Sequence, residues 1–201
     1  MPFSNARIIV FAKAPIPGQC KTRLIPALGE HGASELHARL VRHTLATATQ
    51  AELCPVELHC ADNLQHPFFT ACQQDFPVTL KQQHGADLGE RMANAFDDVL
   101  NSARHVILIG SDCPALTSAD LQQALEALMT NQDCVLKPAA DGGYVLIGLK
   151  ALDRRIFSNI DWGTDKVLEQ TQAKLSAINW HWKELDISWD LDRPEDLAKL
   201  Q

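Results

Sequence analysis

Short apolar runs alternate along the chain with longer segments in which apolar residues recur every three or four positions. Two of the runs, Ile8–Phe11 and Val106–Ile109, are apolar without interruption, which is typical of parallel strands buried on both faces. The longer segments have one apolar face each, most clearly over residues 29–51 and 87–103, as in helices that cover a sheet. This rhythm predicts an α/β fold around a mostly parallel sheet, with both apolar runs in its middle.

The remaining elements follow from the same periodicities. Strands are expected at 56–60, 77–80, 134–136, 144–147 and 178–185, and helices at 66–75, after Thr117 or Ser118, at 156–160 and at 165–175. No Ser/Gly-rich linker, repeat or charge block separates a second domain. Residues 1–201 are therefore expected to form a single Rossmann-like domain.

Charge and composition exclude some classes of partner. The chain has a net charge of −7 and no basic stripe, which argues against nucleic acid or an anionic membrane as the main partner. No apolar run approaches the roughly 18 residues that a bilayer-spanning helix needs. The first residues lack the features of a signal peptide, and the six cysteines form no CxxC pair. We expect a cytoplasmic protein whose cysteines are reduced and mostly buried.

Positive charge is concentrated directly after the first predicted strand. Lys13, Lys21 and Arg23 lie within eleven residues, together with two prolines and Gly18, which make the loop short and stiff. Ligands of open α/β sheets bind at the carboxyl ends of the strands. A solvated basic loop is the plainer interpretation, but in so acidic a chain the cluster favours a site for an oligophosphate.

Carboxylates follow at two further places. Asp112 comes immediately after the run Val106–Ile109, where it is either a ligand for Mg²⁺ or a turn residue that caps the amides after it. Asp190 and Asp192 alternate around Leu191, so in an extended chain both face the same side. Either could complete a metal site, and Asp192 is preferred.

Other polar loops carry weaker signals. The sequence Asp141-Gly142-Gly143 suits a tight hairpin turn or a close approach to a ligand. Asp87 is a natural N-cap with Glu90 as its capping-box partner. The segment Asp161–Thr164 could line an acceptor cleft or anchor a buried Trp162.

Taken together, these segments resemble the nucleotide-diphospho-sugar transferase superfamily, the GT-A fold. They are most similar to a small bacterial family associated with radical-SAM/selenium-domain gene clusters, whose members are often labelled glycosyltransferases. The matching motifs are Phe11–Pro15 with Lys21–Leu24, Asp87–Met92, Gly110–Pro114, Asp141–Tyr144, Trp162–Thr164 and Asp190–Leu197. They occur in order over nearly the whole chain, and the set also resembles small nucleotidyltransferases that guanylylate phospholactate or molybdenum cofactor.

The resemblance implies roles for particular residues. Nucleotide binding would fall to Lys13, Lys21, Thr22, Arg23, Asp87 and Gly89, a Mg²⁺ or Mn²⁺ ion to Asp112 and Asp192, and the reaction to Lys21, Asp112 and Asp141. Gly89 would lie near the base or sugar. Two features depart from the family pattern: Arg193 adds a cation beside Asp192 where relatives usually have Thr, and the glycine-rich opening of larger pyrophosphorylases is replaced by Lys-Ala-Pro-x-Pro-Gly.

Three functions remain open at this point. The first is nucleotidyl transfer, in which a small acceptor attacks the α-phosphorus of a nucleoside triphosphate, and the triphosphate-sized cation cluster favours it. The second is glycosyl transfer from a nucleoside-diphosphate sugar, with Asp141 contacting the sugar or serving as base. The third is non-catalytic nucleotide binding, against which the intact cations and carboxylates argue.

Overall fold

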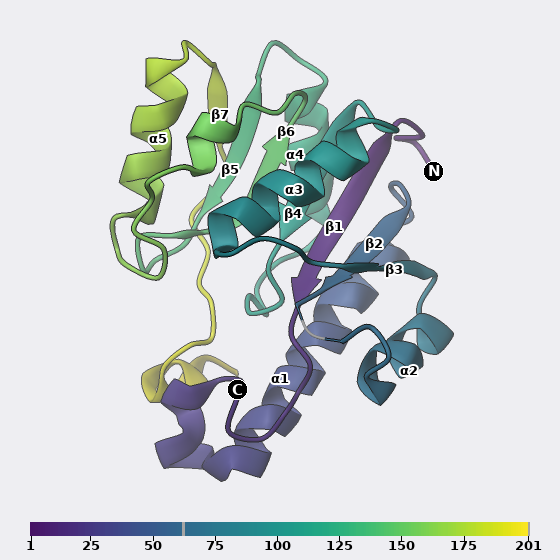
Figure 1. Ribbon diagram of the computed structural model, residues 1–201, viewed down its shortest axis with the longest axis vertical. Coiled ribbons are helices and arrows are strands. Elements are labelled where there is room, and N and C mark those ends of the chain that lie inside the picture. Colours follow the sequence, from purple (N-terminus) through teal and green to yellow (C-terminus); the bar gives the residue numbers. More distant parts are fainter. Residues whose placement is uncertain (62, 201) are drawn as a thin grey trace.

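The computed structural model describes residues 1–61 and 63–200 and contains one seven-stranded sheet in the order β3-β2-β1-β4-β6-β5-β7 (Figure 1). Its strands are β1 (Ala6–Ala12), β2 (Val56–Cys60), β3 (Val78–Gln82), β4 (His105–Ile109), β5 (Cys134–Pro138), β6 (Tyr144–Leu149) and β7 (Trp182–Glu184). Pairing is parallel throughout the described sheet except where β6 pairs antiparallel with β4 and β5. The predicted α/β fold with a mostly parallel sheet is confirmed.

The two apolar runs lie where the sequence predicts. β1 and β4 are neighbours at the centre of the sheet, and Ile8, Ile9, Ile107 and Ile109 have no exposed surface. The chain builds outward from β1 to β2 and β3, and then returns to place β4 on the other side of β1. This reversal creates a crevice between the carboxyl ends of β1 and β4, which is the place where open α/β sheets bind ligands.

Helices cover both faces of the sheet, as Figure 1 shows. Ile8 and Val10 pack with α1 (Ile25–Gln50), α2 (Pro67–Asp75) and α4 (Ser118–Leu128). The alternate residues Ile9 and Phe11 pack with α3 (Leu88–Leu100) and α5 (Val167–Ala177). Burial on both faces explains why these strands have no polar alternation.

Several elements differ from the expected ones. α1 begins at Ile25, and Gly29, at φ 70° and ψ 168°, interrupts its helical backbone. The helix expected at 156–160 is a short 3₁₀ turn, η2 (Arg154–Phe157), and the late strand shrinks to the three residues of β7. Two further 3₁₀ turns are η1 (Thr22–Leu24) and η3 (Pro194–Leu200). Sequence periodicity located these segments but did not give their type or length.

Capping side chains set the starts of two helices. Thr117 caps α4 and forms a capping box with Asp120. Asp87 caps α3 by accepting a hydrogen bond from the Glu90 amide, whereas the Glu90 carboxylate accepts from the Ala86 amide, one residue before the expected partner. All six cysteines are buried, as predicted. None of the helices in residues 1–61 and 63–200 is long and apolar enough to cross a membrane.

Candidate functional site

A cavity of about 510 Å³ opens at the carboxyl ends of β1 and β4. The predicted residues that line it are Lys13, Lys21, Thr22, Arg23, Asp112 and Asp192. They come from the loop after β1, the loop after β4 and the C-terminal segment, which lies beside the first of these loops in Figure 1. The structure therefore brings the predicted phosphate-binding and metal-binding residues into one cavity.

Lys21 joins all three segments. Its backbone is left-handed, at φ 49° and ψ 41°, and its side chain is only 4% exposed. The ammonium group lies 3.0 Å from Asp112 Oδ1 and donates a hydrogen bond to the Leu191 carbonyl. A left-handed non-glycine residue is costly, and such strain persists where the surrounding structure holds it. Here the fixed conformation aims a buried cation at the cavity.

The Asp112 carboxylate is divided between the protein interior and the cavity. Oδ1 is buried, yet the side chain as a whole is 48% exposed, so the exposure belongs to its outer part. Oδ1 faces the Lys21 ammonium and, at 3.7 Å, His37 Nδ1. Burial by itself would raise the pKa of Asp112, but His37 and the Lys21 charge outweigh it and hold the pKa at about 2. Asp112 is thus ionised at neutral pH, with one side open to a ligand.

The C-terminal carboxylates are docked onto the loop after β4. The amide of buried Leu191 donates to the Asp112 carbonyl at 2.8 Å, which places the neighbouring Asp192 at the cavity wall. The Asp192 carboxylate pairs with the Arg23 guanidinium. The sequence pointed to Arg193 as the cation beside Asp192, and Arg193 does line the same neighbouring cavity as Asp192, but the ion pair that the structure records for Asp192 is with Arg23.

Asp190 lies near further negative charge. Burial, followed by the charges of Asp141 and Asp192, raises the pKa of Asp190. These carboxylates line a second cavity of about 480 Å³ next to the first, here called the acidic cavity because five aspartates of the described residues line it, against the three cations Arg23, Arg193 and Lys199. Trp189 and Thr164 line it too, and a wall with so many polar groups suits hydroxyl groups.

The donor set near Asp112 fits a hard divalent cation. No group of three or more His, Cys, Asp or Glu side chains within the described residues could hold a metal ion by itself. Asp112 and Asp192 nevertheless line one cavity, and the outer part of the Asp112 carboxylate, away from Lys21 and His37, is open to it. Mg²⁺ commonly takes one or two carboxylates and completes its shell with water and substrate phosphates. The pair is therefore a suitable partial site.

Asp141 lies at the hairpin between β5 and β6. Its Oδ1 accepts a hydrogen bond from the Gly143 amide at 2.9 Å, and Gly142 has φ 89°, so the tight turn expected from the sequence is present. Asp141 lines the acidic cavity and also a third cavity, of about 240 Å³, between α3 and β6. It faces the neighbouring cavities rather than the cationic one.

Asp87 and Gly89 are not brought to the cationic cavity. Both line a separate hollow of about 340 Å³ on the other side of α3. A Cβ atom at Gly89 would lie 2.5 Å from the Phe157 carbonyl oxygen and 2.8 Å from Trp162 Nε1, so this glycine permits close packing. Trp162 is half-buried against it and also lines, with Thr164, the cavity between α3 and β6, so both the anchor and the cleft alternatives remain open.

Other residues of the same region line the cationic cavity instead. These are Leu88 and Arg91 of α3, Gln83 of the preceding loop and His37 of α1. Leu88 and Arg91 are three positions apart and share a helix face that excludes Gly89, a distinction that helical spacing could have provided. His37, distant in sequence from each motif, gave no such signal.

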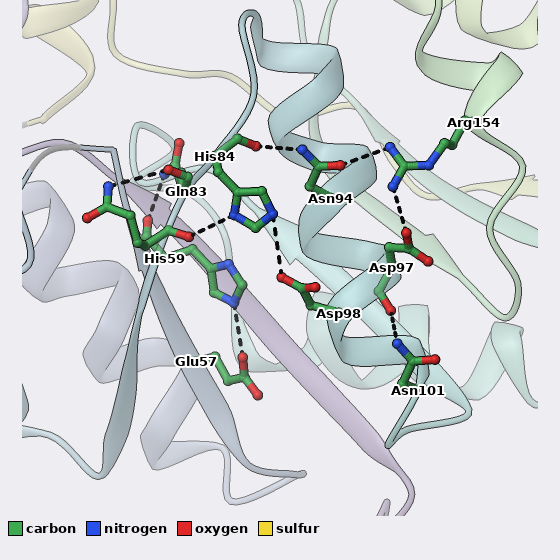
Figure 2. Close-up of polar contacts among 10 residues, drawn as sticks. Glu57, His59, Gln83, His84, Asn94, Asp97, Asp98, Asn101 and Arg154 are labelled. Atoms are coloured by element: carbon green, nitrogen blue, oxygen red, sulfur yellow. Dashed lines mark hydrogen bonds and ion pairs between the residues drawn. The ribbon is translucent and has the colours of Figure 1, made fainter.

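A polar network holds α3 and its preceding loop in place (Figure 2). Arg154 of η2 donates to Asn94 Oδ1 at 2.9 Å and to Asp97 at 2.6 Å, and Asn94 donates to the His84 carbonyl at 2.8 Å. Gln83 Nε2 donates to the His59 carbonyl at 2.7 Å. These contacts fix the loop from which Gln83 and, further on, Leu88 reach the cavity.

Comparison with known families gives one match. The sequence model of the family described as "Uncharacterized protein conserved in bacteria (DUF2064)" matches residues 44–164, more than half of the chain. No curated protein matches.

Solved structures share the fold. A protein of Desulfovibrio desulfuricans G20, described provisionally as a nucleotide-diphospho-sugar transferase, is 29% identical with a TM-score of 0.90, over 98% of this chain and 87% of that one. CMP:2-keto-3-deoxy-manno-octonic acid synthetase in complex with CTP is 13% identical with a TM-score of 0.62, over 98% and 97% of the two chains. Glucosyl-3-phosphoglycerate synthase of Mycobacterium tuberculosis, in complex with Mn²⁺ and UDP, is 9% identical with a TM-score of 0.59, over 98% of this chain and 75% of that one.

Proposed function

Since this chain belongs to the DUF2064 family of bacterial proteins, whose description gives no activity, we propose a function from its site: divalent-metal-dependent nucleotidyl transfer from a nucleoside triphosphate to a small acceptor. The observation that carries the proposal is the meeting of Lys21 with Asp112 at the crevice between β1 and β4. The likeness to a protein described as a nucleotide-diphospho-sugar transferase supports a transferase that uses nucleotides. We further propose that residues 1–201 act as one domain in the cytoplasm.

The cationic loop would bind the phosphates. Lys13 and Thr22 are exposed at the cavity, and the Arg23 side chain is 59% exposed. An exposed guanidinium paired with a single carboxylate can turn to an incoming phosphate at little cost, because surface ion pairs contribute little to stability. Lys21 stays buried against Asp112 and supplies fixed positive charge where negative charge develops on the leaving group.

Asp112 and Asp192 would hold Mg²⁺ or Mn²⁺. When bound, such an ion neutralises charge on phosphate oxygens and so favours departure of an oligophosphate. Lys21 and His37 keep Asp112 ionised and oriented for that role, because both face its inner oxygen. The docking of Leu191 onto the Asp112 carbonyl sets the position of Asp192.

The reaction needs no nucleophile from the protein. An acceptor oxygen forms a bond to the α-phosphorus, the bond from that phosphorus to the bridging oxygen breaks, and pyrophosphate leaves with the electron pair. The acceptor proton passes to a carboxylate or to water. Catalysis then consists of positioning and electrostatic stabilisation, which the cations around the cavity supply.

Glycosyl transfer from a nucleoside-diphosphate sugar is the second candidate. It is favoured by the acidic cavity beside the cationic one, in which Asp141, Asp190 and Trp189 form a wall suited to sugar hydroxyls. The same phosphate-binding residues would then hold a diphosphate leaving group.

A binding and turnover experiment tests the proposal. Calorimetry with each nucleoside triphosphate and with common nucleoside-diphosphate sugars, with and without Mg²⁺ or Mn²⁺, should show metal-dependent binding of one triphosphate. Lys21→Ala should weaken this binding, and exposed Lys183→Met on β7 serves as the matched control. Preference for a sugar nucleotide supports glycosyl transfer, and tight binding without release of pyrophosphate or sugar in any acceptor screen supports a non-catalytic role. Absence of all nucleotide binding overturns the proposal.

A further inference from the structure

The cavity of about 240 Å³ between α3 and β6 differs in character from the two beside it. Its walls are apolar side chains from separate elements, among them Phe11, Met92, Ile147 and Val167. Asp141 is the one charged side chain that lines it in the described part of the chain, and no Lys, Arg or His does so. A ligand with a phosphate or carboxylate would find no cation here and would meet the Asp141 charge.

This apolar cavity adjoins the cationic one. Phe11, Leu88 and Gly110 line both. A Cβ atom built on Gly110 meets nothing within 4 Å, so the junction between the two cavities is open at this residue. A molecule in the apolar cavity can therefore present one end to a nucleotide in the cationic cavity.

The exposure of Leu88 also bears on this cavity. Leu88 is one of the few large apolar side chains that are exposed, at 44%, although it lies in the first turn of a well-capped helix. Leu88 is positioned at the boundary that the two cavities share. A ligand that spans this boundary would therefore contact Leu88 and cover its exposed apolar surface.

We propose that this apolar cavity is the acceptor subsite, and that the acceptor is an uncharged alcohol with a compact apolar body. The inference rests on the proposed nucleotidyl transfer and specifies its second substrate by class. The apolar body packs among Leu88, Tyr144 and Trp162, which line the cavity and are not fully buried, and the hydroxyl lies toward Gly110 and Asp141. Small-molecule sites typically combine an apolar lining with few polar groups that fix orientation.

Asp141 then receives the acceptor proton. Its Oδ1 already accepts from the Gly143 amide, which leaves the second carboxylate oxygen to accept from the hydroxyl. The hydroxyl oxygen bonds to the α-phosphorus, its proton moves to Asp141, and the bond to the bridging oxygen breaks to release pyrophosphate. The product is a nucleotidyl ester of the alcohol.

Matched probes test the chemical class. Benzyl alcohol, cyclohexylmethanol and pentanol are compared with benzoate and benzyl phosphate, in ligand-observed NMR on the full chain with Mg²⁺ and the triphosphate that it binds. The alcohols are expected to bind at least about tenfold more tightly than the two anions. Equal or tighter binding of either anion, or no binding of any alcohol, overturns the proposal.

Variants locate the site. Thr164→Trp places a large side chain at the rim and should abolish alcohol binding, whereas Thr70→Trp on exposed α2 surface should leave it unchanged. Leu88→Lys adds a cation at the mouth and should shift preference toward benzyl phosphate, with exposed Met129→Lys as its control. Retained alcohol binding in Thr164→Trp overturns the assignment of the cavity.

Nucleotide affinity measured in parallel separates this inference from the proposed function. It should persist in Thr164→Trp. If Thr164→Trp loses nucleotide affinity, and nucleotide and alcohol compete for the unmodified protein, the nucleoside occupies the cavity. That result would overturn the acceptor inference but not the proposed function. If the unmodified protein binds no nucleotide, the proposed function is overturned. Alcohol binding can still be compared between the unmodified protein and Thr164→Trp, so the location of the alcohol site is tested separately.

Discussion

Two ion pairs between a buried lysine and an aspartate, Lys21–Asp112 and Lys137–Asp120, occur in the described residues and differ in the partners of their carboxylates. Lys137 of β5 lies 2.8 Å from Asp120 Oδ1 in the first turn of α4, and the Asp120 Oδ2 accepts from the Thr117 amide and hydroxyl. Lys21 lies 3.0 Å from Asp112 Oδ1, but the Asp112 side chain is 48% exposed, against 17% for Asp120. Both lysines also donate to a backbone carbonyl of the C-terminal region, Asp186 and Leu191 respectively.

This difference indicates that the Lys137–Asp120 pair is structural and that the Lys21–Asp112 pair can bind a ligand. Asp120 has protein partners on both oxygens, so nothing remains for a metal or phosphate. Asp112 is held ionised from the inside and left open on the outside. The same pair of residue types therefore takes different roles, because the Lys21–Asp112 pair lies on the wall of the cationic cavity and Asp120 is enclosed by its protein partners.

The largest effect on stability is expected from Lys137→Met. Removing one partner of a buried pair leaves the other charge uncompensated, and the free energy of unfolding should fall by about 3 kcal/mol. Urea unfolding measures it. Nucleotide affinity in calorimetry should be unchanged, and Lys137→Met combined with Asp120→Leu should recover part of the loss. A fall below about 1 kcal/mol would place this pair among ordinary surface contacts.

Asp112→Asn should weaken nucleotide binding strongly and change stability little, the reverse of Lys137→Met. It keeps the shape and removes the charge that a divalent cation requires, so metal-dependent nucleotide affinity should drop by about 100-fold, or roughly 2.7 kcal/mol. The free energy of unfolding should fall less than in Lys137→Met, because the Asn side chain keeps an oxygen that can accept a hydrogen bond from the buried Lys21 ammonium. Calorimetry with and without Mg²⁺ measures the affinity, and Asp98→Asn, 62% exposed on α3, is the control. Full metal-dependent activity in Asp112→Asn contradicts the site.

Arg23→Ala should have a smaller effect on binding, about tenfold. Its guanidinium is exposed, so the loss should be greater at low salt than at high salt, because salt screens exposed charges. Lys21→Ala should depend less on salt, since that ammonium is buried. Nucleotide affinities at two ionic strengths measure the difference, and an identical salt dependence for the two variants would remove the distinction.

The smallest expected effect is on how the free energy of unfolding changes with pH in acid. Burial tends to raise the pKa of Asp120, but its bonds to Lys137 and Thr117 outweigh burial and lower it from the ordinary value of 3.8. The stabilisation by this depressed carboxyl is complete above its unfolded pKa and is lost as the pH falls through the folded pKa. Unfolding free energies measured between about pH 5 and pH 2 should decline less steeply in Lys137→Met than in the unmodified chain. Equal slopes would show that Lys137 does not set this pKa.

The sequence by itself determined the centre of the fold and the edge where the site lies. Ile8–Phe11 and Val106–Ile109 are apolar at every position because both of their faces are buried, and that property is local. Lys13 follows the first of these strands directly and Asp112 follows the second after two residues, so parallel pairing was enough to bring both to one edge. Lys21, nine residues beyond Ala12, reaches the same edge only through the path of its loop.

Only the tertiary structure decided which other residues reach the cavity. The rotation of α3 turns Leu88 and Arg91 toward it and packs Gly89 against Phe157 and Trp162 instead. Arg23, rather than Arg193, pairs with Asp192 because buried Leu191 docks onto the Asp112 carbonyl and fixes the direction of the C-terminal segment. Periodicity shows which face of a helix or strand is buried, because burial follows the local repeat. Contacts between distant loops depend on strand order and on how the loops pack together, and no local sequence pattern contains that information.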